Sequence, residues 1–167
     1  LGDKYLLWNI ARAYNNLGNQ YRLSKNPDKQ REYVLQANAR FRQLADSYPE
    51  DYDIKIALGH NLFACGVVHQ GHQARQFFQD SFEVSGLVME AFPNVPDYAA
   101  SHGRALGYYG MKLNSQGKQD QAEEYFRQAY AIQDKLFDDY PDNPTYARNL
   151  SITSYSLGRL TTRTNRL

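Results

Sequence analysis

The amino-acid sequence predicts an all-α protein, folded as a right-handed solenoid of antiparallel helical hairpins. Three observations support this prediction. Helical periodicity is abundant, strand signals are scarce, and the chain repeats itself at intervals of 44 residues (Pro49 to Pro93) and 48 residues (Pro93 to Pro141). A repeat of this length is typical of a helical pair that must stack on its neighbours to bury its apolar face.

The helical periodicity is clearest between residues 120 and 140. Apolar side chains recur there at spacings of three and four, which places them on one face of a helix. They are Ala122, Tyr125, Phe126, Ala129, Ile132, Leu136 and Phe137. The sequence has no long alternation of apolar and polar residues, and the hairpin dipeptides Asn-Gly and Asp-Gly are absent.

Proline residues mark the ends of the predicted helices. Asn26-Pro27 and Asn143-Pro144 place a capping side chain before a proline in the first turn, and Pro96 opens another helix. Pro49, Pro93 and Pro141 each follow an aromatic residue and end a helix. The predicted helices span residues 4–23, 28–47, 52–69, 73–91, 97–115, 119–140 and 144–163.

The repeats define the expected domain organisation. Ala57-Leu58-Gly59 recurs as Ala105-Leu106-Gly107, and Phe92-Pro93 recurs as Tyr140-Pro141. We expect one domain over residues 1–167, with repeats at 4–49, 50–93 and 94–141 and a closing helix at 143–163. Gly18, Gly110 and Gly158 occupy equivalent positions, where a missing side chain would let two helices approach closely.

Composition limits the classes of function. The 167 residues carry a net charge of +1, with 42% hydrophobic and 22% charged residues, so the bulk charge favours neither nucleic acid nor an anionic membrane. The single cysteine, Cys65, allows no internal disulfide, and no apolar run is long enough to span a bilayer. We expect a cytoplasmic protein, and a start at Leu1 rather than methionine suggests a piece of a longer chain.

Small residues at fixed spacing in "YYGMKLNSQGKQDQAEEYFRQAY" carry a family resemblance. Gly110, Gly117 and Ala122, together with Leu17-Gly18 and Leu157-Gly158, resemble the tetratricopeptide repeat (TPR) family over nearly the whole chain. The long period is similar to kinesin-light-chain repeats, and "FPNVPDYAASHGRALGYYG" is similar to arrays attached to bacterial signalling proteins. The second repeat departs from the pattern, because Leu62 stands at the aligned position and Gly66 follows one turn later.

The resemblance implies a TPR-like fold that binds a peptide or protein segment in a concave groove lined by the first helix of each pair. The implied groove residues are Arg12, Asn15, Asn19, Arg22, His60, Phe63, Arg104, Tyr108, Met111, Asn114, Tyr155 and Arg159. Arginine and asparagine suit a carboxylate or a peptide backbone. Because first helices carry many arginines and second helices carry most of the acids, we expect an acidic or carboxylate-bearing partner.

Two other functions stay open. The first helix is apolar nearly all round, with Tyr5, Leu6, Leu7, Trp8 and Ile10, which suits self-association, whereas the last helix is polar and resembles a cap. Alternatively, the chain is the sensor arm of a larger signalling enzyme.

Catalytic, metal and cofactor sites are not expected. Cys65 lies in the apolar run "LFACGVV", which is typical of a buried thiol, and His69 and His72 have no third ligand nearby in the sequence. Tyr108, Tyr109 and Tyr155 are candidates for ligand contact. The basic tail with Arg163 and Arg166 is read as a frayed end.

Overall fold

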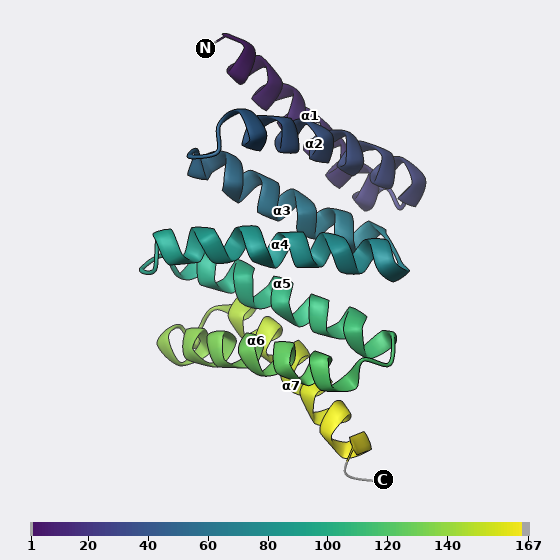
Figure 1. The fold of residues 1–167 in the computed structure, drawn as a ribbon, viewed down its shortest axis with the longest axis vertical. Helices are drawn as coiled ribbons and strands as arrows, with labels where there is room; N and C mark the ends of the chain where they lie inside the picture. The colour runs from purple at the N-terminus through teal and green to yellow at the C-terminus, as the bar shows by residue number, and fades with distance from the viewer. Residues whose placement is uncertain (1, 165–167) are drawn as a thin grey trace. The chain divides into compact units, whose positions relative to one another are not determined.

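The computed structural model describes residues 2–164, with side chains through Thr162, and every regular element in that range is an α-helix (Figure 1). The helices are α1 (Gly2–Leu23), α2 (Pro27–Ser47), α3 (Tyr52–Val68), α4 (Gly71–Ala91), α5 (Pro96–Ser115), α6 (Gln119–Asp139) and α7 (Pro144–Thr164). The predicted all-α class is therefore confirmed, and each predicted helix is found with ends that agree to within two residues.

The predicted capping residues start their helices. Asn26 Oδ1 accepts a hydrogen bond from the Lys29 backbone N–H at 3.2 Å, and Asn143 Oδ1 accepts one from Thr145 at 3.0 Å. Asp51, which the sequence analysis did not single out, caps α3 in the same way by accepting from the Asp53 N–H at 3.0 Å.

The chain forms two compact units, one up to Val84 and one from Ser85 onward, and the boundary lies inside α4. Each unit has its own core of buried side chains, so each is built around its own helix pairs. The expected single domain over residues 1–167 stays a prediction.

In the first unit, α2 packs between α1 and α3. Its core joins buried side chains from all three helices: Ala11 of α1; Ala37, Phe41 and Leu44 of α2; and Ile54, Leu58 and Leu62 of α3. Trp8 extends this core by placing its ring edge-on to Phe41, with centroids 5.9 Å apart.

Glycines set the distance between paired helices in the first unit. A Cβ on Gly18 would lie 2.8 Å from Val34 Cγ2, so the predicted close approach at Gly18 is confirmed. In the α3–α4 pair, Leu62 is buried at the aligned position and Gly66 admits the partner one turn later, because a Cβ there would lie 2.7 Å from the Phe78 ring. The irregular second repeat therefore keeps a close helix approach at a shifted position.

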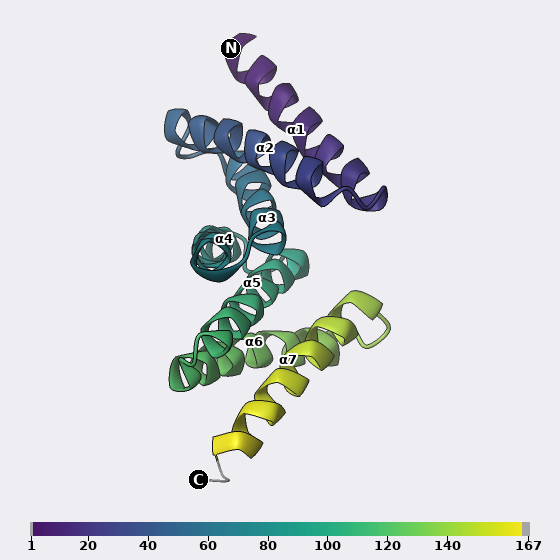
Figure 2. The ribbon, with the colours of Figure 1, turned by 90° about the vertical axis from the view of Figure 1, so that its right-hand side faces the viewer.

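In the second unit, α6 packs against both α5 and α7, and α5 also contacts α7 (Figure 2). Its most buried large side chains are Leu106 and Leu113 of α5, Phe126 of α6 and Leu160 of α7. The Tyr146 hydroxyl of α7 donates to Asp97 Oδ1 of α5 at 2.8 Å, which ties the starts of the two helices together. Among the described helices, none combines the length and apolarity needed to cross a bilayer.

The predicted close approach is confirmed at Gly110 and wrong at Gly158. A Cβ on Gly110 would lie 3.0 Å from the Phe126 ring, whereas a Cβ on Gly158 would meet no described atom within 4 Å. The reason is that Gly158 lies on exposed surface of α7, where no second helix of a pair packs within the described residues.

Candidate functional site

The predicted ligand-contact residues of α1 divide by exposure. Arg12, Asn19 and Arg22 are exposed, as a ligand-binding surface requires. Asn15 is half-buried, and its Oδ1 accepts a hydrogen bond from the buried Asn61 Nδ2 at 3.3 Å. Asn15 therefore has a structural role in addition to any contact with a ligand.

The Asn15 contact is the outer end of a buried amide network. Asn61 Nδ2 also donates to the Val34 carbonyl at 3.2 Å, and Asn61 Oδ1 accepts from Asn38 Nδ2 at 2.9 Å. Arg42 Nε donates to Asn38 Oδ1 at 3.1 Å, and the Arg42 guanidinium continues to Asp80 of α4. Because every link joins two helices or two turns of one helix, the network holds the first unit in one register.

The two predicted contact residues of α3 also differ. His60 is exposed, while Phe63 is half-buried and meets the Phe78 ring edge-on with centroids 5.3 Å apart. Phe63 therefore packs within the α3–α4 pair and presents only part of its ring.

In the second unit, the predicted contact residues lie on α5 and α7. Met111, Tyr155 and Arg159 are exposed, and the Arg159 guanidinium lies 5.6 Å from the centroid of the Tyr155 ring. Tyr155, with 66% of its surface exposed, is the most exposed of the large apolar and aromatic side chains in the described chain. Asn114 is half-buried.

Tyr109 was expected to be a candidate for ligand contact, but the structure places it in the core. It is 9% exposed and packs edge-on against Tyr125 of α6, with centroids 4.6 Å apart, so it is a core residue. Its neighbour Tyr108 is half-buried. Consecutive residues on a helix point about 100° apart, so Tyr109 packs on Tyr125 while Tyr108 points in another direction along the surface of α5.

Arg104 and Tyr108 meet α6 and α7 around a small polar hollow. Its volume is about 10 Å³, and its lining comes from three helices: Arg104, Gly107 and Tyr108 of α5; Gln133 of α6; and Asn149, Ile152 and Thr153 of α7. Burial lowers the pKa of the Arg104 guanidinium, and the nearby charge of Arg148 acts in the same direction. Two predicted site residues thus share one site with polar residues that the sequence analysis did not identify.

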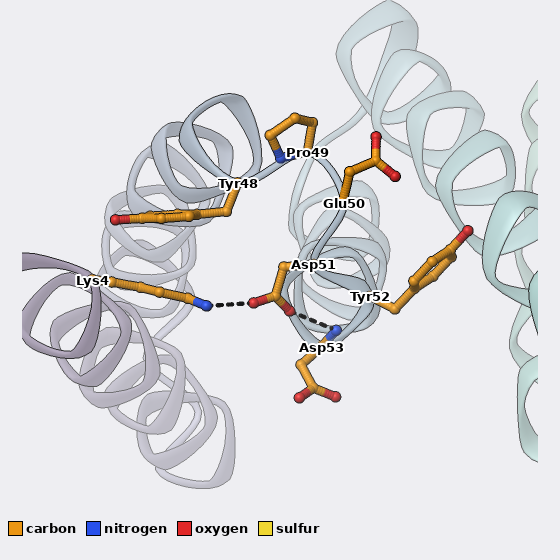
Figure 3. A pocket seen from close by; sticks show the side chains of 7 residues that line it. All are labelled: Lys4, Tyr48, Pro49, Glu50, Asp51, Tyr52 and Asp53. Atoms are coloured by element: carbon orange, nitrogen blue, oxygen red, sulfur yellow. Dashed lines mark hydrogen bonds and ion pairs between the residues drawn. The ribbon is translucent and has the colours of Figure 1, made fainter. Parts of the chain in front are cut away.

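A second feature that the sequence analysis missed is an open depression at the turn between α2 and α3 (Figure 3). It measures about 560 Å³ and is lined by Lys4 of α1 and by the segment Tyr48–Asp53. The Lys4 ammonium lies 2.5 Å from Asp51 Oδ2 and 4.8 Å from the centroid of the Tyr48 ring. The hydrogen bond from Lys4 is the largest effect that lowers the pKa of Asp51, and its counterpart raises the pKa of Lys4.

Cys65 and His69, the side chains considered for catalysis or metal binding, both pack within the first unit. Cys65 is buried, and this burial raises its pKa to about 12, so the thiolate nucleophile is disfavoured. His69 Nδ1 lies 2.8 Å from the Cys65 carbonyl oxygen, and its ring packs on Phe77. The described part of the chain contains no group of three His, Cys, Asp or Glu side chains placed to hold a metal ion. The Arg163 side chain and Arg166 lie outside the described residues.

No protein-family model matches the chain, and no curated protein shows significant sequence similarity to it.

Proposed function

We propose that this chain is a protein-interaction module, a right-handed solenoid of the TPR type that binds a peptide or protein segment on its first helices. The observation that carries the proposal is the exposure of arginine, amide and aromatic side chains on α1, α5 and α7. Arg12, Asn19 and Arg22 are exposed in the first unit, and Met111, Tyr155 and Arg159 are exposed in the second.

The chemistry of these side chains favours a partner with carboxylates and with backbone peptide groups that are not already hydrogen-bonded. Arginine donates through a planar fork that matches a carboxylate, and an asparagine amide pairs with a peptide group. Tyr155 offers a large flat surface beside the Arg159 charge, which suits an apolar side chain next to an acidic one. The ligand is therefore expected to carry both acidic and apolar residues.

Paired alanine variants test this function. A peptide ligand is first selected from a random peptide library against the whole chain, and its Kd is measured by fluorescence anisotropy. We expect Arg12→Ala with Arg22→Ala, or Tyr155→Ala with Arg159→Ala, to weaken binding at least tenfold. Removing two positive charges from α6, by Arg127→Ala with Lys135→Ala, controls for net charge.

The results distinguish binding on α1 and α7 from an effect of net charge alone. Loss of affinity in the α1 or α7 variants with little change in the α6 variant supports the proposal. Equal loss in the α6 variant indicates that only net charge matters, and unchanged affinity in both first-helix variants overturns the assignment of the site.

A second candidate function is self-association through α1. Tyr5 is 64% and Leu6 is 61% exposed on this helix, and they lie side by side. Exposed apolar neighbours of this size favour a protein contact. Sedimentation velocity at rising concentration tests this function: a dimer that Leu6→Lys abolishes would support it, and a monomer throughout would exclude it.

A further inference from the structure

An open groove lies in the second unit, where the ends of α4 and α6 meet the start of α5 (Figure 1). Its volume is about 680 Å³, which is within the range of roughly 300–1,000 Å³ that is typical of ligand sites. All of its lining residues lie between Met89 and Tyr140, after the boundary at Val84, so the groove belongs entirely to the second unit. It is called the helix-end groove.

The floor of the helix-end groove is apolar. Ala99 of α5 and Ile132 of α6 line it, and both pack against the core that contains Leu136. Ala131 of α6 is exposed beside Ile132, and its small side chain leaves the groove open. Met89 of α4 adds an unbranched side chain, which adapts its shape to what it contacts. An apolar side chain that enters the groove therefore exchanges water for contact with apolar atoms.

The rim of the groove is acidic at the two helix ends. Glu90 and Asp139 are exposed lining residues in the last turns of α4 and α6, and neither last turn contains a basic residue. The C-terminus of a helix carries a negative partial charge, so a cation is favoured there and a carboxylate is not. Within the described residues, neither carboxylate forms an ion pair. Two helix ends and two carboxylates therefore present negative charge to one groove.

Two neighbouring residues indicate where a cation would lie. Lys135, the one basic residue of the lining, precedes Asp139 by one helical turn, so the positive charge lies further from the end of α6. Tyr140 follows Asp139 directly and is 46% exposed, and the face of an aromatic ring attracts a cation. A cationic group of a ligand is therefore expected beside Asp139 and Tyr140 and away from Lys135.

We propose that the helix-end groove docks a short basic and apolar segment of a partner protein, with an apolar side chain on Ile132 and a lysine or arginine beside Glu90 and Asp139. The charge of the rim selects this occupant, because an acidic segment would meet two carboxylates of like sign. The groove is formed mainly by the second helices α4 and α6 and prefers positive charge, so it is a different surface from the one in the proposed function and does not depend on it.

The test uses three synthetic peptides of equal length that carry the same neutral fluorophore. The first alternates pairs of lysine and leucine, the second replaces lysine by glutamate, and the third replaces leucine by serine. Their Kd for the whole chain is measured by fluorescence anisotropy. We expect the lysine–leucine peptide to bind at least about tenfold more tightly than either of the others. Its affinity should fall as the salt concentration rises from about 50 to about 500 mM, because salt screens exposed charges.

Charge variants locate the binding of the lysine–leucine peptide. Glu90→Gln with Asp139→Asn should weaken it about tenfold and reduce its salt dependence. This variant should fold normally, because a carboxylate at a helix C-terminus is locally unfavourable. Lys135→Glu should strengthen binding. Glu32→Gln with Asp46→Asn removes the same charge from exposed positions of α2 and should leave the Kd unchanged.

A space-filling variant tests the apolar part of the groove. Ala131→Trp places a large side chain over the floor and should abolish binding of the lysine–leucine peptide. Ala39→Trp makes the same change at an exposed position of α2 and should leave binding unchanged. Both alanines are exposed, so neither change disturbs the core, and circular dichroism checks that the helices are retained.

Several results would overturn the docking site. These are no binding of any peptide, equal binding of the lysine–leucine and lysine–serine peptides, tighter binding of the glutamate peptide, or equal loss of affinity in the α2 control variants. Arg12→Ala with Arg22→Ala distinguishes this site from the proposed function. That variant should leave the lysine–leucine peptide unaffected, and a weaker Kd would place the peptide on the first helices and refute the helix-end groove. If this peptide behaves as expected while the peptide selected for the first helices ignores their variants, the groove stands and the proposed function fails.

Discussion

Replacing Gly66 by alanine tests how the irregular second repeat is packed. Gly66 lies inside α3, and a Cβ there would lie 2.7–2.8 Å from three atoms of the Phe78 ring. Phe78 is 1% exposed, and its ring also meets Phe63 of α3 edge-on with centroids 5.3 Å apart, so the ring is enclosed by packed atoms and cannot move away freely. The added methyl group must therefore displace packed atoms.

The expected effect is a balance of two terms. Alanine in place of glycine inside a helix stabilises by about 1 kcal/mol, whereas overpacking a core costs about 1–3 kcal/mol. Because the ring can yield little, we expect Gly66→Ala to lower the free energy of unfolding by about 1–2 kcal/mol. In a chain of this length, that corresponds to a Tm about 2–8 °C lower.

Gly59→Ala provides a matched control in the same helix. Its Cβ would lie 3.6 Å from Val84 Cγ1, an ordinary van der Waals distance, so only the gain in helix propensity remains. Urea unfolding followed by circular dichroism should show Gly59→Ala at least as stable as the wild type and Gly66→Ala less stable. If Gly66→Ala is as stable as Gly59→Ala, the close approach of Phe78 to α3 is wrong. Adding Phe78→Leu should remove part of the Gly66→Ala penalty, as a double-mutant cycle would measure.

Three further predictions follow from individual contacts. Cys65, with its pKa raised to about 12 by burial, should not react with Ellman's reagent at pH 8 in the folded chain, and it should react fully in denaturant; a fast native reaction would contradict its burial. Burial and the hydrogen bond to Asp97 raise the pKa of Tyr146 to about 12. The stability that the protonated tyrosine contributes is therefore fully present below pH 10 and is lost between pH 10 and 12. Chemical unfolding over that pH range should show that Tyr146→Phe loses less stability than the wild type. Asp51→Asn should keep the α3 cap but lose the attraction to Lys4, whereas Asp51→Ala should also lose the cap, at a cost of about 0.5–2 kcal/mol. Because the pKa of Asp51 is lowered in the folded chain, the stability advantage of the wild type over Asp51→Asn should vanish as the pH falls through that pKa. A stability advantage that persists in acid would contradict the ion pair.

The helices and their ends could be predicted from the sequence because their signals are local. Proline in the first turn, an asparagine cap such as Asn26 or Asn143, and apolar spacing of three and four all act within a few neighbouring residues. The repeat also predicted where small residues would sit. Gly18 and Gly110 do admit a partner helix, since both face the second helix of their own pair.

The candidate site could be predicted only in part. Arg12, Asn19 and Tyr155 are exposed, and the binding surface that the family resemblance implies stays a prediction. Asn15 and Phe63 are engaged in contacts with Asn61 and Phe78, which the spacing of residues in one helix does not reveal.

Local patterns along the chain are enough to predict that it is helical, where each helix begins and ends to within two residues, and which positions recur from pair to pair. Which of these positions are buried depends on how the helices pack. Gly66 and Gly158 are both helical glycines, yet one lies against a ring and the other on open surface. Gln133 looks like any polar residue of an amphipathic helix, and it becomes a buried acceptor only because α5 and α7 meet over it. Burial depends on what packs from elsewhere in the chain, and no local pattern contains that information.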